Sequence, residues 1–186
     1  FGDEINWVKI GDLHGSTKQG FMLPQDFLIN NTEEKITKKG FDSSTTKMIP
    51  KGTLLVAIFA FVGKTSILNI DACTNQAIVA LIPKKDVSAS GKKIEILPKF
   101  AYYMVLASRG NLEAMSRGGN QKNINKTKLN SLEIPVPDKE IQKRVVEFLD
   151  EMNEDVSETI KLKNQLETKL FQLYGDILTD VKLENS

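Results

Sequence analysis

Cysteine and histidine are nearly absent from this sequence of 186 residues, which contains one of each. A single thiol, Cys73, excludes an internal disulfide, and the lone His14 gives no basis for a histidine-dependent catalytic triad or a metal site. Long hydrophobic runs are also missing, because the longest, Leu54 to Val62, is far shorter than a membrane span. The sequence shows no charged-then-apolar leader, so we expect a cytoplasmic protein.

The motifs of common enzymes are incomplete. Gly63-Lys64-Thr65 matches the end of a phosphate-binding loop, but Ile58 stands where that loop requires its first glycine. The Gly-x-Ser-x-Gly elbow of hydrolases and the Gly-x-Gly-x-x-Gly turn of dinucleotide-binding proteins do not occur. We therefore predict a non-catalytic chain that has no metal and no cofactor of its own.

Charge is nearly balanced over the whole chain, with 25 basic and 24 acidic residues, but it is distributed unevenly. Residues 84–128 carry 10 basic and 3 acidic side chains, whereas residues 138–186 carry 7 and 12. Clustered lysine and arginine displace counterions from nucleic-acid phosphates, so the basic middle is a candidate polyanion site. On charge alone, a solvated lysine-rich loop is the simpler alternative.

Short apolar segments rich in β-forming residues mark the strands of the chain before Asp138. We expect strands at 7–10, 53–59, 65–68, 76–82 and 132–136, a helix at 100–108 and a helical turn at 112–116. Because the connections are short, successive strands are expected to form an antiparallel or barrel-like sheet rather than βαβ units. The pattern predicts an α+β fold, with a mixed or antiparallel, β-rich domain over residues 1–137.

Residues 138–175 have the pattern of one long coiled-coil-type helix. Asp138 is a suitable N-cap, and no glycine or proline follows it before Gly175, where we expect the helix to end and a frayed tail, 176–186, to begin. Apolar side chains recur at steps of three and four and form a heptad seam, interrupted by Thr159 and Lys163. The apolar members of this seam are Ile141, Val145, Phe148, Met152, Val156, Leu166, Leu170 and Leu173.

A helix of this length would extend about 55 Å, which is more than a domain of this size can cover with its own core. We therefore expect the seam to pair with another helix, through self-association or through a second segment of the same kind. The alternative is a terminal helix that folds back onto its own domain.

A segment rich in glycine and amides, residues 117–125, is the most unusual part of the sequence. Two adjacent glycines permit close backbone approach, while asparagine and glutamine can read adenine, and arginine or lysine can read guanine or hold phosphate. The alternative is an ordinary surface loop whose amides bond nearby backbone groups.

Several blocks occur together in a characteristic order. They are 7–13, 50–54 with Gly63-Lys64, 74–77, 118–124, and 134–137 followed by Glu140 and 148–150. In this order, over about residues 5–175, they resemble the specificity subunit of type I restriction-modification enzymes, in particular one target recognition domain and its conserved helix. The sequence departs from that family in having one such domain and one helix, and in Glu140-Ile141-Gln142, where a Glu-Gln pair is common. It also begins abruptly, so we expect a half-subunit or a fragment.

The resemblance implies both a function and partners. A subunit of this family binds double-stranded DNA, reads a bipartite target with one domain per half, and directs methyltransferase and restriction subunits to it. S-adenosylmethionine would then bind to the methyltransferase subunit and not to this chain. Two half-subunits paired antiparallel through their long helices would rebuild the two-domain arrangement and read a split palindrome.

The DNA contacts are expected in variable-looking polar stretches. Asn75 and Gln76 lie in a family block, so we interpret their amides as buried framework. The base-reading candidates are Lys38, Lys39, Ser43, Ser44, Thr45, Thr46, Lys47 and Lys64. The candidates for contacts with the DNA backbone or groove wall are Arg117, Asn120, Gln121, Lys122 and Asn123.

Three other functions stay open at this point. One is a coiled-coil adaptor for protein interactions that binds no DNA, although such a protein does not require the basic segment. Another is the recognition fragment of a fused restriction-methyltransferase. The third is an anti-restriction decoy that occupies the methyltransferase.

Overall fold

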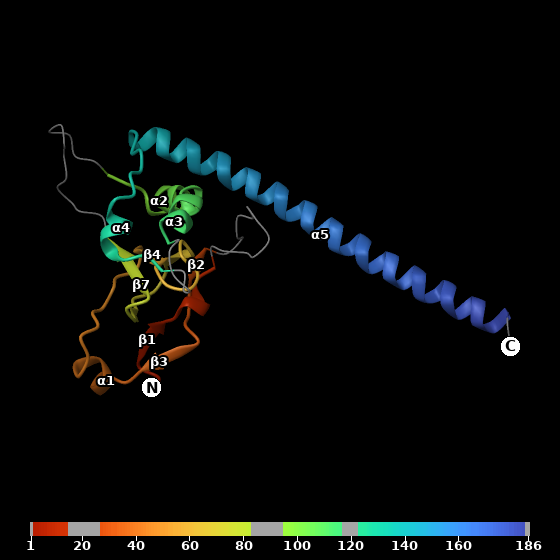
Figure 1. Cartoon of the computed structure of the whole chain (residues 1–186), viewed down its shortest axis with the longest axis horizontal. Coiled ribbons are helices and arrows are strands. Elements are labelled where there is room, and N and C mark those ends of the chain that lie inside the picture. Colours follow the sequence, from red (N-terminus) through yellow and green to blue (C-terminus); the bar gives the residue numbers. More distant parts are fainter. Residues whose placement is uncertain (1, 15–26, 83–94, 117–122, 185–186) are drawn as a thin grey trace. The chain divides into compact units, whose positions relative to one another are not determined.

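The computed structural model describes residues 2–14, 27–82, 95–116 and 123–184, with side chains up to residue 173 (Figure 1). The chain divides into two units, Phe1–Phe148 and Leu149–Ser186. The first unit contains every described strand and all of the shorter helices. The second unit is formed by the greater part of one long helix.

Among the described residues, short strands form two sheets in the first unit. The three-stranded sheet has the order β3-β1-β6. Its members are β1 (Ile5–Val8), β3 (Glu34–Ile36) and β6 (Cys73–Thr74). The four-stranded sheet has the order β2-β5-β4-β7, with β2 (Leu28–Ile29), β5 (Thr65–Leu68), β4 (Leu54–Ala57) and β7 (Ile78–Leu81).

Both sheets are mixed. Strand β1 pairs antiparallel with β3 and parallel with β6. Strand β4 pairs antiparallel with both β5 and β7, while β2 pairs parallel with β5. All four side chains of β4 are buried, which explains why this central strand has an unbroken apolar sequence. The predicted α+β class with a mixed, β-rich domain is confirmed.

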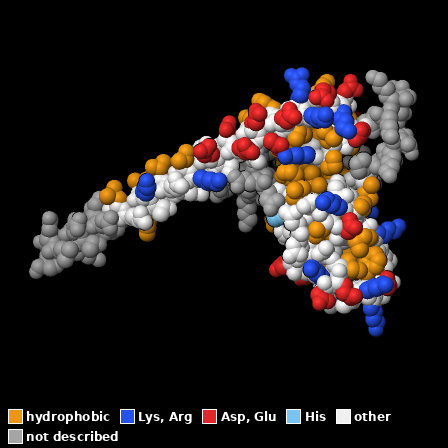
Figure 2. Space-filling model, turned by 180° about the vertical axis from the view of Figure 1, so that it is seen from behind, with side chains coloured by type: hydrophobic (Ala, Val, Ile, Leu, Met, Phe, Trp, Pro, Cys, Tyr) orange, Lys and Arg blue, Asp and Glu red, His pale blue; other side chains and the backbone are white. Residues whose placement is uncertain are grey.

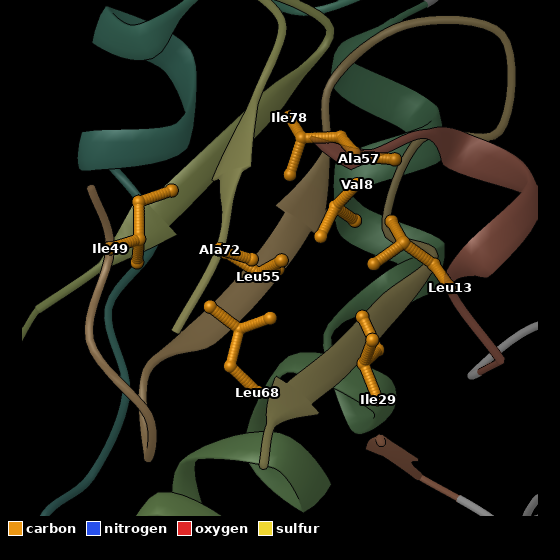
Figure 3. Packing of buried hydrophobic residues seen from close by; sticks show 9 residues of the cluster. All are labelled: Val8, Leu13, Ile29, Ile49, Leu55, Ala57, Leu68, Ala72 and Ile78. Atoms are coloured by element: carbon orange, nitrogen blue, oxygen red, sulfur yellow. The ribbon is translucent and has the colours of Figure 1, made fainter. Parts of the chain in front are cut away.

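The two sheets share one hydrophobic core (Figure 3). Val8 on β1, Leu55 on β4 and Leu68 on β5 are each no more than 1% exposed, and the stick view shows side chains from both sheets directed into the same space. The cluster consists of Val8, Leu13, Ile29, Ile49, Leu55, Ala57, Leu68, Ala72 and Ile78. Burial of this cluster is what joins the two sheets into one domain.

Short helices surround the sheets. They are the 3₁₀ helix η1 (Ile10–Asp12), α1 (Lys38–Asp42), α2 (Pro98–Ala107), α3 (Arg109–Met115) and α4 (Lys126–Asn130). Helix α2 starts with proline at its first position, which suits a helix start because that N–H has no intrahelical partner. It packs on β5 and β4, and α3 follows beside it (Figure 1).

Two predictions about regular structure are wrong. Residues 132–136 form no strand, because Pro135 interrupts the segment, Pro137 follows it, and proline lacks the N–H that a ladder needs. The long helix α5 spans Lys139–Glu184, so it does not end at Gly175, and residues 176–184 of the predicted frayed tail are helical. One glycine costs only about 1 kcal/mol in a helix interior, which a helix of this length tolerates.

Cys73 on β6 is fully buried, and its Sγ lies 3.4 Å from the Asn6 carbonyl oxygen. Burial raises the pKa of this thiol above its usual value of 9.0. The folded state therefore retains the proton at a pH where the unfolded chain loses it, so the thiol's contribution to stability is full below pH 9 and is lost at higher pH.

We expect iodoacetamide to alkylate Cys73 at least about 100-fold more slowly in the native chain than in the denatured chain, because reaction requires local opening. We also expect Cys73→Val to reduce the fall in unfolding free energy above pH 9. Mass spectrometry and urea titrations at several pH values measure the two effects. Equal labelling rates in both states would show that the thiol is accessible in the folded chain.

Candidate nucleic-acid interface

The segment 37–48, called the α1 loop below, contains most of the predicted base-reading residues. Its short helix is capped at both ends. The hydroxyl of Thr37 accepts a hydrogen bond from the Gly40 N–H at 3.0 Å, and Ser43 Oγ donates to the Gly40 carbonyl at 3.2 Å. Ser44 Oγ donates to the Phe41 carbonyl at 2.9 Å. These caps satisfy backbone groups that a helix this short leaves open, so they hold its shape.

The α1 loop is also tied to the rest of the domain. The Lys38 N–H donates to Glu4 Oε2 at 2.7 Å, Thr46 Oγ1 donates to the Thr74 carbonyl at 3.0 Å, and Ile49 exchanges backbone hydrogen bonds with Ala72. These contacts position a largely polar surface on which the side chains of three lysines, two serines, one threonine, one aspartate and one methionine are exposed: Lys38, Lys39, Asp42, Ser43, Ser44, Thr45, Lys47 and Met48. Thr46 is half-buried, and its hydroxyl proton is engaged by Thr74.

The connection between β4 and β5, residues 58–64, is called the β4–β5 tip. Ile58 and Val62 are buried, whereas the Phe59 and Phe61 side chains between them are 38% and 50% exposed. Ala60, at the apex, has a positive φ of 58°. Sequence analysis missed these aromatic residues because it assigned Phe59 to a continuous apolar strand. No local sequence signal shows that the chain reverses at Ala60.

Lys64 lies at the end of this tip, and its amine is directed into the domain. Its Nζ donates to the Ile10 carbonyl at 3.0 Å and lies 5.9 Å from the centre of the Phe61 ring. Burial lowers the pKa of Lys64, and the nearby charge of Asp12 opposes that shift. The structure therefore does not bring the Lys64 amine together with the exposed amines of the α1 loop.

A turn at residues 74–77 connects the α1 loop with the β4–β5 tip. Its Thr74 carbonyl accepts from Thr46, and its Ala77 carbonyl accepts from the Ile58 N–H at 2.9 Å. The Asn75 Oδ1 accepts from the Ala77 N–H at 3.0 Å, so its amide satisfies a backbone group, although the side chain is half-buried and not buried as expected. The expectation that Gln76 is buried is wrong: its side chain is exposed between the two polar elements, because the turn directs it outward.

Asn123 is the one predicted groove-wall residue that the structure describes; Arg117, Asn120, Gln121 and Lys122 lie outside the described residues. Asn123 pairs with Phe59 in an antiparallel bridge, and the adjacent Ile124 N–H donates to the Ile58 carbonyl at 2.9 Å. The chain thus returns from a distant part of the sequence to the β4–β5 tip. It places an exposed amide beside an exposed phenyl ring.

Besides the exposed Asp42 and Met48 side chains, this region presents ammonium, hydroxyl, amide and phenyl groups, which can bind phosphates and base edges. Within the described ranges, no cluster of three or more histidine, cysteine or carboxylate side chains could hold a metal ion. None of the described helices combines the length and hydropathy required to span a membrane.

A second candidate surface follows the heptad seam of α5. Seven of its eight predicted members are at least 39% exposed, and Val145 is half-buried (Figure 2). At the start of α5, the buried side chain is that of Gln142. Because successive helix residues are rotated by about 100°, Gln142 lies roughly a quarter-turn from the seam. The first turn of α5 therefore buries a different side of the helix from the seam. The pattern predicted the apolar stripe, and the structure leaves it exposed along the described part of the helix.

Gln142 is a residue whose importance the sequence did not reveal. Its side chain is fully buried, and its Oε1 accepts from the Leu97 N–H at 2.9 Å. Its Nε2 donates to the carbonyl oxygens of Glu95 at 2.9 Å and Pro137 at 2.8 Å. This glutamine therefore connects the first turn of α5 to the two segments that precede α2 and α5.

Comparison with known proteins assigns a family to this arrangement. The sequence pattern described as "Type I restriction modification DNA specificity domain" matches residues 1–169. The chain is 30% identical over 171 residues to the type I restriction enzyme EcoR124I/EcoR124II specificity subunit of Escherichia coli. It is 26% identical over 184 residues to the type I restriction enzyme HindI specificity subunit of Haemophilus influenzae.

These alignments include most of this chain but less than half of each relative. They cover 85% and 96% of the chain, and 40% and 34% of the respective relatives. In three dimensions, the chain resembles one from a structure described as "Structural basis underlying complex assembly and conformational transition of the type I R-M system". The TM-score is 0.65 at 19% identity, over 92% of this chain and 36% of the other, which shows a common fold.

Proposed function

Because this chain belongs to the family of type I restriction modification DNA specificity domains, we propose that it reads one half of a bipartite double-stranded DNA target. In this function it directs methyltransferase and restriction subunits to that target and performs no chemistry itself. The observation that supports the proposal is that the 74–77 turn links the α1 loop to the β4–β5 tip, through the hydrogen bonds from Thr46 to Thr74 and from Ile58 to Ala77. Together these elements expose cationic, hydroxyl, amide and aromatic groups on one domain, with one carboxylate, Asp42.

The α1 loop offers two kinds of contact. Lys38, Lys39 and Lys47 are exposed and form no ion pair with another described residue, so their amines are suited to DNA phosphates. Ser43, Ser44 and Thr45 lie between Lys39 and Lys47. Ser43 and Ser44 donate their hydroxyl protons to the Gly40 and Phe41 carbonyls, so their oxygens can only accept from a base edge, whereas the Thr45 hydroxyl can donate or accept. Phosphate contacts set the position of the domain on the duplex, while base contacts select the sequence.

The test is selection from a pool of random DNA duplexes. We expect the chain to enrich a short sequence, present as two inverted copies with a constant spacer if two chains pair antiparallel through α5. An adaptor without DNA-binding activity would leave the pool unenriched, which would contradict the proposal. A chain that enriches a sequence but never recruits a methyltransferase subunit would instead support a decoy.

Lys47→Ala is expected to weaken binding to all duplexes by a similar factor and to lower the slope of log affinity against log salt by about 1. Thr45→Val is expected to relax the preference at one base pair, at a cost of roughly 1–3 kcal/mol. Fluorescence anisotropy titrations between roughly 50 and 200 mM salt separate the two effects. Lys161→Ala, an exposed lysine on α5, is the control and should change neither quantity.

A further inference from the structure

We infer that the β4–β5 tip is a base-reading element, in which the Phe61 ring contacts the C5 methyl group of a thymine in the major groove. This inference rests on the proposed DNA-binding function and goes beyond it, because it assigns a specificity-determining residue and the chemical group that it recognises. It also replaces Lys64, whose amine is engaged inside the domain, as the reading residue of this loop.

The backbone at the apex of the tip is strained and firmly held. The Phe61 N–H donates to the Phe59 carbonyl at 2.6 Å across Ala60, whose φ is 58°. This is a γ-turn with positive φ at a non-glycine residue, a form that is rare and unfavourable. Hydrogen bonds between Ala57 and Lys64 and between Gly63 and Ala57 close the base of the tip. Strain that the surrounding structure maintains is concentrated at ligand-binding sites.

The strained turn determines which side chains reach solvent. The buried side chains of Ile58 and Val62 anchor the tip in the domain, at 4% and 2% exposed. Phe59 and Phe61 are directed outward, although burial would stabilise each of these large apolar side chains. The backbone conformation therefore exposes both phenyl rings to solvent on a tip closed by backbone hydrogen bonds.

The charges around the rings balance, because two cations, Lys64 and Arg109, lie near two carboxylates, Asp12 and Glu113. Lys64 lies beside the Phe61 ring, and the aliphatic part of Arg109 packs against Gly63 at the base of the tip. All four charged groups have partners within the domain, and the Lys64 amine donates to the Ile10 carbonyl, so the exposed phenyl rings and not net charge distinguish this tip. Glu113 pairs with Arg109 at 2.9 Å, and Asp12 accepts from the backbone N–H groups of Lys9 and Glu33.

Two features point to duplex DNA as the ligand of the tip: its connection to the α1 loop and the chemistry of its exposed groups. The tip shares the 74–77 turn with the α1 loop, so a duplex bound to the exposed lysines of that loop is within reach of the tip. Asn123 beside Phe59 adds an amide that can pair with a base edge. In the major groove, the thymine methyl group is the apolar feature that distinguishes one base, and a phenyl ring is a matching contact.

The test uses the duplex that the wild-type chain enriches from a random pool. Each thymine in that duplex is replaced in turn by deoxyuridine, which removes only the C5 methyl group. We expect one replacement to weaken wild-type binding about 5-fold, and Phe61→Ala to weaken binding to the original duplex about 5- to 100-fold. We expect the same replacement to have no further effect on Phe61→Ala. Phe171→Ala, an exposed phenylalanine on α5, is the matched control and should bind like wild type.

The outcomes separate this inference from the proposed function. If the wild-type chain enriches no sequence, the DNA-binding proposal fails and this inference fails with it. If it enriches a sequence but no deoxyuridine replacement matters, or Phe61→Ala binds like wild type, the assignment of Phe61 is overturned while the proposed function stands. If Phe61→Ala instead loses a methyltransferase subunit and retains DNA selection, the tip is a protein-docking surface. The deoxyuridine series requires no variant, so a Phe61→Ala chain that failed to fold would not prevent the test.

Discussion

Leu170→Glu is expected to convert a dimer of this chain into a monomer, whereas Phe171→Glu is expected to leave the dimer intact. The two residues are adjacent on α5 and both are exposed, at 64% and 81%. Leu170 belongs to the heptad seam, while Phe171 lies about 100° around the helix from it. A buried carboxylate in the seam would lose its hydration without gaining a partner, which costs several kcal/mol in each of two symmetric positions.

Light scattering measures this effect directly. The wild-type chain and Phe171→Glu should have a mass near twice the 20.8 kDa of one chain, whereas Leu170→Glu should have the mass of a single chain. A wild-type monomer at all concentrations would contradict self-association through the seam. Dissociation caused equally by both substitutions would show that general charge repulsion, and not the seam, controls assembly.

The direction of pairing can be tested on the same helix. The seam is nearly symmetric about Thr159, since Phe148 and Leu170 lie at equal distances in sequence on either side of it, as do Met152 and Leu166. An antiparallel pair centred there would place Met152 against Leu166 of the other copy, with apolar partners throughout its outer parts. The central position would be occupied by two threonines, and Lys163 would lie near Val156.

A mixture of Met152→Cys and Leu166→Cys chains should therefore form mixed disulfide dimers under mild oxidation. A parallel pair would instead form dimers of each variant with itself. Cys73 should not form disulfides in this experiment, because its thiol is fully buried. Non-reducing electrophoresis of chains that differ in tag length distinguishes the products.

Gln142→Leu is expected to lower the free energy of unfolding by about 3 kcal/mol, because it removes three hydrogen bonds to buried backbone groups and offers none in return. The leucine side chain has a similar volume, so the loss comes from the polar groups and not from a cavity. The three groups are the Leu97 N–H and the carbonyl oxygens of Glu95 and Pro137. Urea unfolding followed by circular dichroism measures the change.

Gln165→Leu is the matched control, since this glutamine is exposed on the same helix. It should alter the unfolding free energy by no more than about 0.5 kcal/mol. Equal stability of the two variants would show that Gln142 does not secure the start of α5. A loss of unfolding free energy in Gln142→Leu but not in Gln165→Leu would show that the buried amide of Gln142 stabilises the start of α5.

Features that depend on neighbouring residues were predictable. The strand at 65–68 was predicted with its observed bounds, and the helix predicted at 100–108 is α2, which spans Pro98–Ala107. The seam on α5 followed from steps of three and four, because a helix repeats about every 3.6 residues whatever it contacts. The order of the sequence blocks also indicated the family to which the chain belongs.

Features that depend on distant residues required the tertiary structure. The parallel pairing of β2 with β5 joins Leu28–Ile29 to a strand that begins only at Thr65, and nothing local in either strand specifies its partner. The roles of Lys64, Gln76 and Phe61 were not predictable for the same reason. The Ile10 carbonyl binds the amine of Lys64, the 74–77 turn exposes Gln76, and the contacts that close the β4–β5 tip direct Phe61 outward.

The sequence by itself thus determined the family, the fold class and the apolar stripe of α5, because periodicity and block order are properties of the chain. Only the tertiary structure decided which polar side chains are exposed and which are used inside the domain. Both lysine and glutamine can donate a hydrogen bond to a phosphate, a base or a backbone carbonyl. The choice depends on which of these partners the folded chain brings within hydrogen-bonding distance, and for Lys64 and Gln142 it brings backbone groups of the same domain.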